Sequence, residues 1–319
     1  MTASDPTDSP TIHVIAPSGP VPEASLRAGM SIVRRSRRAT WRVASNVETR
    51  AGYFAGPDEA RLAGIVEALL DPGAHAVWCA RGGYGATRIL RPLETAMTAR
   101  TAPDQGPPPL PPIVGFSDVT ALLCWALARH GCRGVHGPVL TSLARVDHED
   151  QARVLDLLDG DVPPPLEVAG PTSCTLHGGV AEGPLIVGNL EVLRSLIGTP
   201  DLPDLRGCVL GIEEVGERPY RIDRALTQLR EAGALRGVAG VAVGQLHACE
   251  EPEGTMSAGA TAREVVLERL EGLGVPVVTG FPFGHAPERN AALVFGAPTR
   301  LHADHGTLEQ LEGVKTSRS

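Results

Sequence analysis

One serine of this sequence stands where a strand-like run of apolar residues passes directly into a helix-like run. It is Ser117, within residues 113–120. A serine at the carboxyl end of a strand exposes its hydroxyl, and the amides after it lie at the positive end of a helix, where they can bind an oxyanion. The turn therefore fits an acyl-transfer nucleophile, but it is equally typical of a serine that caps a helix. Val119 replaces the second glycine of the G-x-S-x-G elbow, so a standard α/β-hydrolase is not predicted.

A nucleophilic serine needs a general base, and one of the ten histidines is well placed for this role. His285 follows a strand-like run that ends in glycine and proline, whereas the other nine lie on strand, helix or loop positions without such a turn. A carboxylate must then orient the imidazole and stabilise its cation. Glu213 directly follows the apolar run 208–212, and Glu214 and Glu217 are the alternatives. The residues thus support a triad hypothesis in the chain order Ser, Glu, His.

A second turn rich in glycine follows another strand-like run, at residues 78–87. Glycines let a backbone approach a ligand closely and leave amides free to donate, so this turn could supply a further oxyanion donor. The alternative is an ordinary connection between a strand and a helix. A nucleotide-binding loop is not predicted, because neither G-x-G-x-x-G nor a P-loop lysine is present.

The elements that must position these residues alternate between strands and helices in the first half of the chain. Strands separated by helices of about 10 to 15 residues indicate βαβ units on a parallel sheet, whose ligands gather at the carboxyl ends of the strands. The second half is mixed α and β, with a larger share of strand. The predicted strands are 12–16, 43–45, 76–79, 113–116, 208–212, 238–244 and 275–279, followed by a β-rich tail at 291–301. The predicted helices begin near 22 and 86 or span 57–70, 118–130, 219–232 and 262–272.

The length of 319 residues is sufficient for two domains. We expect an N-terminal α/β domain at 11–158 that contains the serine, a proline-rich linker at 159–175, and a smaller, strand-rich C-terminal α/β domain at 176–312 that contains the glutamate and the histidine. A further proline-rich stretch, 101–112, is predicted to form an exposed loop.

The composition excludes several kinds of partner. A net charge of −8 argues against nucleic acid, and the basic cluster 34–38 is expected to end a helix, where cations are favoured. The six cysteines form no C-x-x-C pair and are predicted to be reduced core residues. Residues 1–10 lack the features of a signal peptide, and the longest apolar run, 121–128, is too short to cross a bilayer. We expect a soluble, cytoplasmic protein without a membrane partner.

Six segments, taken together and in order, resemble the LD-carboxypeptidases, also called muramoyltetrapeptide carboxypeptidases, which are serine peptidases of cell-wall recycling. The resemblance covers nearly the whole chain. The segments are 15–19, 81–85, 115–120, 188–200, 213–224 and 284–285. Two positions depart from the usual family pattern: Glu214 stands where the family usually has Asp, and Val187 stands where it often has Gly.

The resemblance implies a fold and a set of site residues. The N-terminal domain would be flavodoxin-like, and the active site would lie between the two domains. Ser117 would be the nucleophile, Glu213 the orienting acid and His285 the base. The resemblance also implies backbone oxyanion donors at Gly83 and Asp118 and substrate contacts from Arg81, Gly82, Tyr84 and Asn189. It implies a homodimer, and neither cofactors nor metals are expected.

The predicted function is removal of the terminal D-alanine from murein tetrapeptides, at the bond between the L-diamino acid and D-alanine, in peptidoglycan recycling. One alternative is a microcin-immunity-type peptidase that cleaves aminoacyl-nucleotide antibiotics. It would need an aromatic platform for the base, and only 3% of the chain is aromatic; Trp41, Trp78 and Trp125 are the candidates. The other alternative is a non-catalytic binding protein, which the presence of all three triad residues argues against.

Overall fold

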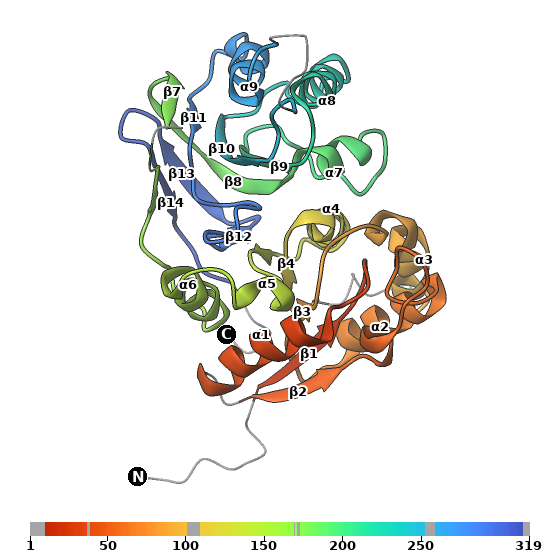
Figure 1. The fold of residues 1–319 in the computed structure, drawn as a ribbon. Coiled ribbons are helices and arrows are strands. Elements are labelled where there is room, and N and C mark those ends of the chain that lie inside the picture. The colour runs from red at the N-terminus through yellow and green to blue at the C-terminus, as the bar shows by residue number, and fades with distance from the viewer. Residues whose placement is uncertain are drawn as a thin grey trace.

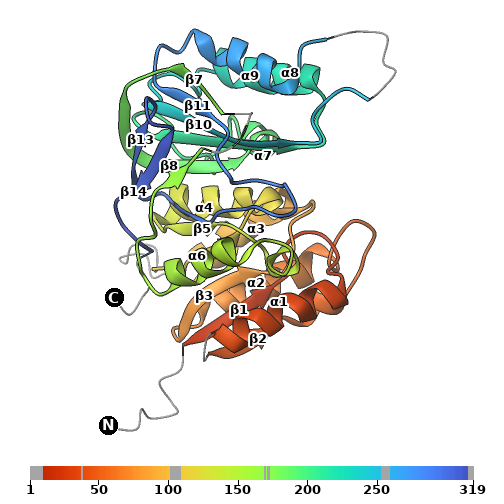
Figure 2. The same ribbon diagram turned by 60° about the vertical axis from the view of Figure 1, so that its left-hand side comes forward.

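The computed structural model describes residues 10–36, 39–100, 109–168, 170, 173–252 and 259–314. This part of the chain forms two layered α/β units, one below the other in Figure 1, with helix α4 between their two sheets (Figures 1 and 2). The predicted mixed α/β fold with two sheets is therefore confirmed.

The lower unit is built on a sheet with the order β12-β5-β4-β3-β1-β2, in which all pairs except β12–β5 are parallel. Its helices cover both faces: α2, α3 and α4 pack on one face, and α1, α5 and α6 on the other. The strands of this unit are β1 (Thr11–Ile15), β2 (Thr40–Val43), β3 (Ala74–Cys79), β4 (Ile113–Gly115) and β5 (Gly134–His136). The helices are α1 (Glu23–Ser36), α2 (Asp58–Leu70), α3 (Ala86–Thr98), α4 (Thr120–His130), α5 (Leu140–Leu143) and α6 (His148–Leu158).

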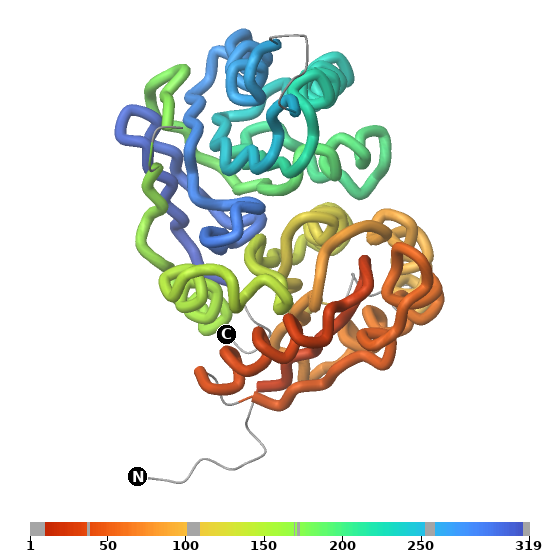
Figure 3. The backbone as a smooth tube through the Cα atoms, viewed as in Figure 1, coloured from red at the N-terminus to blue at the C-terminus, as the bar shows by residue number. Residues whose placement is uncertain are grey.

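The outer strand of this sheet comes from the distant C-terminal part of the sequence. β12 (Leu293–Phe295) pairs antiparallel with β5, and the blue end of the tube in Figure 3 returns to the lower unit beside α6. A segment of the range 176–312 thus completes the sheet of the first unit. The two units are consequently linked by strand pairing as well as by side-chain packing.

The upper unit is an eight-stranded sheet in the described residues, with the order β6-β14-β13-β8-β9-β10-β11-β7. Its centre, β8 to β11, is parallel, and the flanking strands are antiparallel. The strands are β6 (Leu166–Glu167), β7 (Cys174–His177), β8 (Val180–Asn189), β9 (Val209–Val215), β10 (Gly240–His247), β11 (Val277–Thr279), β13 (Pro298–His302) and β14 (Thr307–Gln310). The helices are α7 (Leu190–Ser195), α8 (Pro219–Glu231) and α9 (Ala262–Glu271).

Several predicted boundaries are wrong in detail. Residues 43–45 are not a strand, because β2 ends at Val43 and a 3-10 turn follows at Ser45–Glu48. The helix expected at 118–130 begins at Thr120, after a separate 3-10 turn. Strand β9 runs on to Val215, so Glu213 lies inside the strand rather than after it. The range 159–175 contains β6 and the start of β7.

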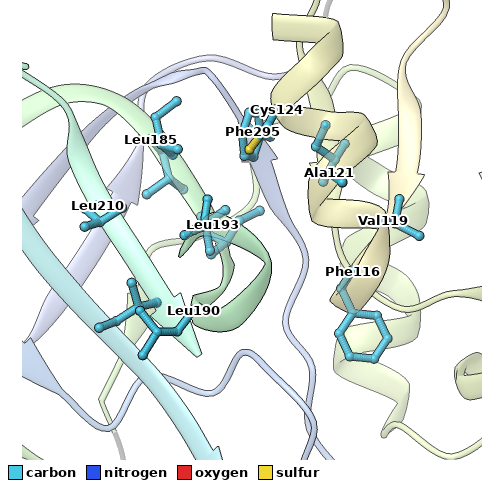
Figure 4. Close-up of a cluster of buried hydrophobic side chains, with 14 of the residues drawn as sticks. Phe116, Val119, Ala121, Cys124, Leu185, Leu190, Leu193, Leu210 and Phe295 are labelled. Atoms are coloured by element: carbon cyan, nitrogen blue, oxygen red, sulfur yellow. The ribbon is translucent and has the colours of Figure 1, made fainter. Parts of the chain in front are cut away.

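Helix α4 joins the two units through a shared apolar core. Figure 4 shows Cys124 of α4 on the side of the helix that faces Leu185 and Leu193 of the upper unit, while Val119 lies on the other side. The residues labelled there are Phe116, Val119, Ala121, Cys124, Leu185, Leu190, Leu193, Leu210 and Phe295. Fully burying one leucine or phenylalanine contributes about 1.5–3 kcal/mol, so this contact fixes the start of α4 firmly against the upper unit.

Other sequence predictions can be checked against the described residues. Arg34 and Arg35 occupy the last turn of α1, as expected for cations, whereas 37–38 and the loop portion 101–108 lie outside the described residues. All six cysteines are free thiols, four of them buried and two half-buried. None of the described helices is both long and apolar enough to cross a membrane.

Candidate active site

Ser117 occupies a strained position between β4 and α4. Its φ is +64°, a left-handed value that non-glycine residues rarely adopt. Such outliers cost about 1–3 kcal/mol and cluster at functional sites. The residue preceding the 3-10 turn is Phe116 and the one preceding α4 is Val119, and neither cap has a side-chain hydrogen bond. Ser117 is thus not a helix cap, and the alternative interpretation of this turn is wrong.

The second glycine-rich turn lies directly against this serine. A Cβ on Gly82 would come within 3.0 Å of the Ser117 Cβ and 3.3 Å of its Oγ, so a larger residue would displace Ser117. The Gly82 carbonyl accepts the Gly19 N–H at 3.0 Å, which holds the second turn against residues 15–19. The structure therefore brings three sequence motifs, at 15–19, 81–85 and 115–120, into one cluster.

Two backbone amides beside Ser117 are available to an oxyanion. In the described part of the chain, the N–H groups of Gly83 and Asp118 donate to no protein acceptor. The Asp118 side chain is buried, and its Oδ2 accepts the Ala86 N–H at 2.8 Å, which ties the start of α3 to the serine turn. Burial raises the pKa of Asp118, against the opposing effect of this amide hydrogen bond. The Asp118 side chain thus anchors the turn, while the backbone N–H of Asp118 stays available to a ligand.

Glu213 and His285 form a hydrogen-bonded pair. Glu213 Oε2 lies 2.6 Å from His285 Nδ1; the Glu213 side chain is fully buried and that of His285 is 15% exposed. Between β11 and His285 the chain passes through Gly284 at φ +131°, where a Cβ would come within 3.1 Å of Glu213 Oε2. The Glu213 carboxylate is hydrogen-bonded to Nδ1 of His285, so Nε2 stays available, as a general base requires.

His285 lies close to the serine turn without a hydrogen bond to it. Its ring centroid is 4.7 Å from the ring of Phe116, the residue before Ser117. Among the described residues, no hydrogen bond joins Ser117 Oγ to His285. Catalytic hydrogen bonds are often long in unliganded structures and tighten in the substrate complex, so the arrangement fits a serine and base that close on substrate.

The loop that contains His285 is tied to the lower unit by Asp150 of α6. The Asp150 carboxylate is buried and accepts the Asn290 N–H at 2.7 Å and the Arg289 Nε–H at 3.1 Å. Asn290 Oδ1 in turn accepts the Gly284 N–H at 3.2 Å. Burial raises the pKa of Asp150. These bonds connect the His285 loop to the unit that contains Ser117.

The alternative acids have other partners. Glu214 is buried and accepts three hydrogen bonds, from Asn189 Nδ2 at 2.8 Å and from the N–H groups of Glu191 at 2.9 Å and Val215 at 2.8 Å. Burial raises its pKa to about 7. Glu217 forms an ion pair with Arg221 one helical turn later. Both residues have structural roles, which leaves Glu213 as the carboxylate facing the histidine.

The residues expected to contact substrate occupy different environments. Asn189 is buried and caps α7 by accepting the Val192 N–H at 3.1 Å, so its side chain already has protein partners. Arg81 donates to the carbonyl of Pro20. Tyr84 is 53% exposed at the edge of the glycine turn, with its ring 5.5 Å from that of Phe54. Gly82 is thus buried directly against Ser117, whereas Tyr84 is the expected contact whose side chain is most open to solvent.

The tryptophans do not provide a platform near the site. Trp78 and Trp125 are fully buried and donate to Pro138 O at 2.9 Å and Glu94 Oε2 at 2.8 Å. Trp41 belongs to β2, an edge strand of the sheet that β3 and β1 separate from β4. The suggestion that Trp78 or Trp125 stacks on a nucleobase is wrong, because their rings have no exposed face.

A pocket of about 410 Å³ adjoins the histidine loop, at the carboxyl ends of β10 and β11. Gln245, Phe281 and Ala286 contribute to its wall. Gln245 holds this wall in place, because its side-chain oxygen accepts the Ala286 N–H at 2.6 Å. Within the described ranges, no cluster of His, Cys, Asp and Glu side chains could hold a metal ion.

Comparisons with known proteins match both halves of the chain. The LD-carboxypeptidase N-terminal domain matches residues 12–137, and the LD-carboxypeptidase C-terminal domain matches residues 182–301. A protein of Synechocystis sp. is 40% identical over 94% of each chain. The murein tetrapeptide carboxypeptidase of Pseudomonas aeruginosa is 32% identical, covering 91% of this chain and 93% of that one.

Solved structures share the fold over almost the whole chain. The muramoyltetrapeptide carboxypeptidase of Oxalobacter formigenes superposes with a TM-score of 0.74 at 28% identity, covering 96% of this chain and 99% of that one. MccF in complex with glutamyl sulfamoyl guanosine gives a TM-score of 0.80 at 19% identity, covering 96% of this chain and 97% of that one. At that identity, the second likeness concerns the fold alone.

Proposed function

This chain belongs to the LD-carboxypeptidase family, and we propose that it releases the terminal D-alanine from murein tetrapeptides. The family predicted from the six motifs is thereby confirmed, and the chain is an enzyme, a serine carboxypeptidase. The observation that supports the reaction best is the Glu213–His285 hydrogen bond beside the strained turn of Ser117.

The mechanism follows from the positions of these groups. His285 Nε2 accepts the proton of Ser117 as Oγ attacks the carbonyl of the L-centre at position three. The amides of Gly83 and Asp118 bind the oxyanion, and losing one such donor costs about 3 kcal/mol of transition-state stabilisation in comparable sites. His285 then protonates the departing D-alanine amine, and water hydrolyses the acyl-enzyme. Glu213 holds the imidazole in the productive tautomer and stabilises its cation throughout.

The proposal favours a murein peptide over an aminoacyl-nucleotide. The relative named for murein tetrapeptides is 32% identical over nearly its full length, whereas the MccF structure is 19% identical. The burial of Trp78 and Trp125 removes two of the three tryptophans that could stack on a nucleobase. A peptide substrate with a free terminal carboxylate therefore fits the chain better.

Turnover of two substrates tests this choice. The purified protein is incubated with a murein tetrapeptide and, separately, with an aminoacyl sulfamoyl adenosine, and the released amino acid is quantified. We expect kcat/KM for the tetrapeptide to exceed that for the nucleotide by at least about 100-fold, a difference of roughly 3 kcal/mol in transition-state binding. A tetrapeptide with a D-centre at position three is the stereochemical control and should not be cleaved. Hydrolysis of the nucleotide alone would contradict the murein assignment.

The cellular setting belongs to the same proposal. We place the reaction in peptidoglycan recycling in the cytoplasm, carried out by a homodimer. The six free thiols support a reducing compartment. Sedimentation of the purified protein measures the dimer, and accumulation of tetrapeptides in a deletion strain measures the recycling step. A non-catalytic binding protein would fail to react with a serine-directed fluorophosphonate.

A further inference from the structure

One fully buried histidine beside the active site has no part in the mechanism above. His136 is the last residue of β5, paired with Gly115 of β4 on one side and with Leu293 of β12 on the other. Neither of its ring nitrogens has a hydrogen-bond partner among the described residues. A buried polar atom left unpaired costs about 1–3 kcal/mol, so nearly all such atoms in native proteins are satisfied by protein or internal water.

The His136 ring packs against both segments that hold the nucleophile and the base. Its centroid lies 6.2 Å from that of Phe116, which precedes Ser117, and 6.1 Å from that of Phe283, two residues before His285. Both contacts are edge-to-face, with interplanar angles of 79° and 86°. His136 therefore sits where the two halves of the triad meet.

Further unpaired polar atoms occur on two residues that hold His285 and its loop. Glu213 uses Oε2 to bind His285, whereas its buried Oε1 has no partner in the described chain. Asn290 holds the Gly284 N–H through its Oδ1, and its buried Nδ2 is likewise unpaired. The chemistry of these atoms is complementary: a carboxylate oxygen accepts, an amide nitrogen donates, and a neutral imidazole does one of each.

Burial keeps His136 neutral near pH 7. Loss of hydration lowers its pKa to about 4, with a smaller opposing effect of the Glu213 charge and a smaller lowering effect of His285. A neutral ring retains one N–H donor and one acceptor nitrogen, which is what a bridging water needs.

We propose that His136 is a positioning residue of the triad, which hydrogen-bonds through one internal water to Glu213 Oε1 and so fixes the carboxylate that orients His285. An internal water needs two to four polar partners in a roomy polar site. In this proposal the unpaired atoms of His136, Glu213 and Asn290 are those partners. The inference rests on the proposed triad. It adds a residue from the nucleophile-bearing unit to the support of the acid in the other unit.

Two substitutions separate this role from simple packing. His136→Phe keeps a ring for the edge contacts but removes both nitrogens, and His136→Gln keeps a donor and an acceptor. The readout is the rate at which a fluorophosphonate labels Ser117, because this reaction needs an activated serine but not the correct peptide. Thermal unfolding midpoints establish that each variant is folded.

We expect His136→Phe to slow labelling about 10-fold or more, the effect of one hydrogen bond to a charged group. On the tetrapeptide, kcat should fall by the same factor while KM stays within about twofold, because the lost interaction does not touch substrate. His136→Gln should restore most of the rate. Labelling of His136→Phe at the wild-type rate, or an equally slow His136→Gln, would overturn the proposal.

A crystal structure at atomic resolution provides a test that does not depend on variants. The expected result is a water within about 3.2 Å of both Glu213 Oε1 and a ring nitrogen of His136. A dry site would overturn the proposal. Failure of the wild-type protein to react with the fluorophosphonate would instead overturn the triad itself, so the two failures are distinguishable.

Discussion

Substitution of Gly82 by alanine tests whether the glycine turn sets the position of the nucleophile. Gly82 has no left-handed backbone angle, so alanine introduces only a methyl group and no backbone strain. That methyl group would lie 3.0 Å from Ser117 Cβ, whereas ordinary contacts begin at 3.4 Å. The serine or the glycine turn must therefore move by at least about 0.4 Å, a shift typical of small overpacking changes.

The expected loss of rate follows from this displacement. A misplacement of about 1 Å in an active site can cost about 100-fold, so a shift of about 0.4 Å should cost roughly sixfold or more. Both kcat for D-alanine release and the fluorophosphonate labelling rate should fall by this factor. The overpacking should also lower the free energy of unfolding by about 1–3 kcal/mol.

Gly272→Ala is the matched control. Gly272 follows α9 at φ −74°, and a Cβ there would meet nothing within 4 Å. The kcat, labelling rate and unfolding midpoint of the Gly272→Ala variant should equal those of the wild-type protein. If Gly82→Ala also labels and turns over at the wild-type rate while folded, the glycine turn does not support Ser117 in the way described.

Three further predictions concern buried carboxylates. Glu213→Gln should leave the fold intact and lower kcat about 1,000-fold or more, because the amide stabilises the wrong imidazole tautomer; D-alanine release within tenfold of the wild-type rate would contradict this. Burial raises the pKa of Glu214 in the folded protein to about 7 from 4.5, so the folded state retains a proton that the unfolded chain releases. The free energy of unfolding should then fall by roughly 3 kcal/mol as pH rises from 4.5 to 7, and Glu214→Gln should remove this contribution, which urea unfolding at several pH values measures; identical slopes would refute it. Asp150→Asn weakens the contacts to Arg289 and Asn290. It should lower the free energy of unfolding by about 2 kcal/mol and slow D-alanine release. Unchanged values for both would show that Asp150 does not hold the His285 loop in place.

The sequence allowed the main features of the site to be predicted because they depend on local patterns. Alternation of strands and helices gives the parallel sheet, and the abrupt change from strand to helix marks Ser117. The choice between Glu213 and Glu214 could not be made from periodicity alone. The two side chains point to opposite faces of one strand, and the sequence does not say which face meets the histidine. The family resemblance supplied that choice, and the Glu213–His285 hydrogen bond agrees with it.

Features that depend on distant pairing were missed. The antiparallel pairing of β12 with β5 joins residues more than 150 positions apart, and a short apolar segment gives no sign of its partner strand. The sequence does not distinguish His136 from the other histidines for the same reason, because its position beside Phe116 and Phe283 exists only in three dimensions. The burial of Trp78 and Trp125 likewise depends on packing between distant elements, which the sequence does not reveal.

Release of D-alanine from a murein tetrapeptide by Ser117→Ala tests the central claim most directly. Ser195→Ala is the control, since Ser195 is exposed and its hydroxyl bonds only to the Val192 carbonyl of its own helix. The wild-type protein and the control should release D-alanine at equal rates, and Ser117→Ala should be slower by about 1,000-fold or more. Undiminished release by Ser117→Ala would contradict the assignment of Ser117 as the nucleophile.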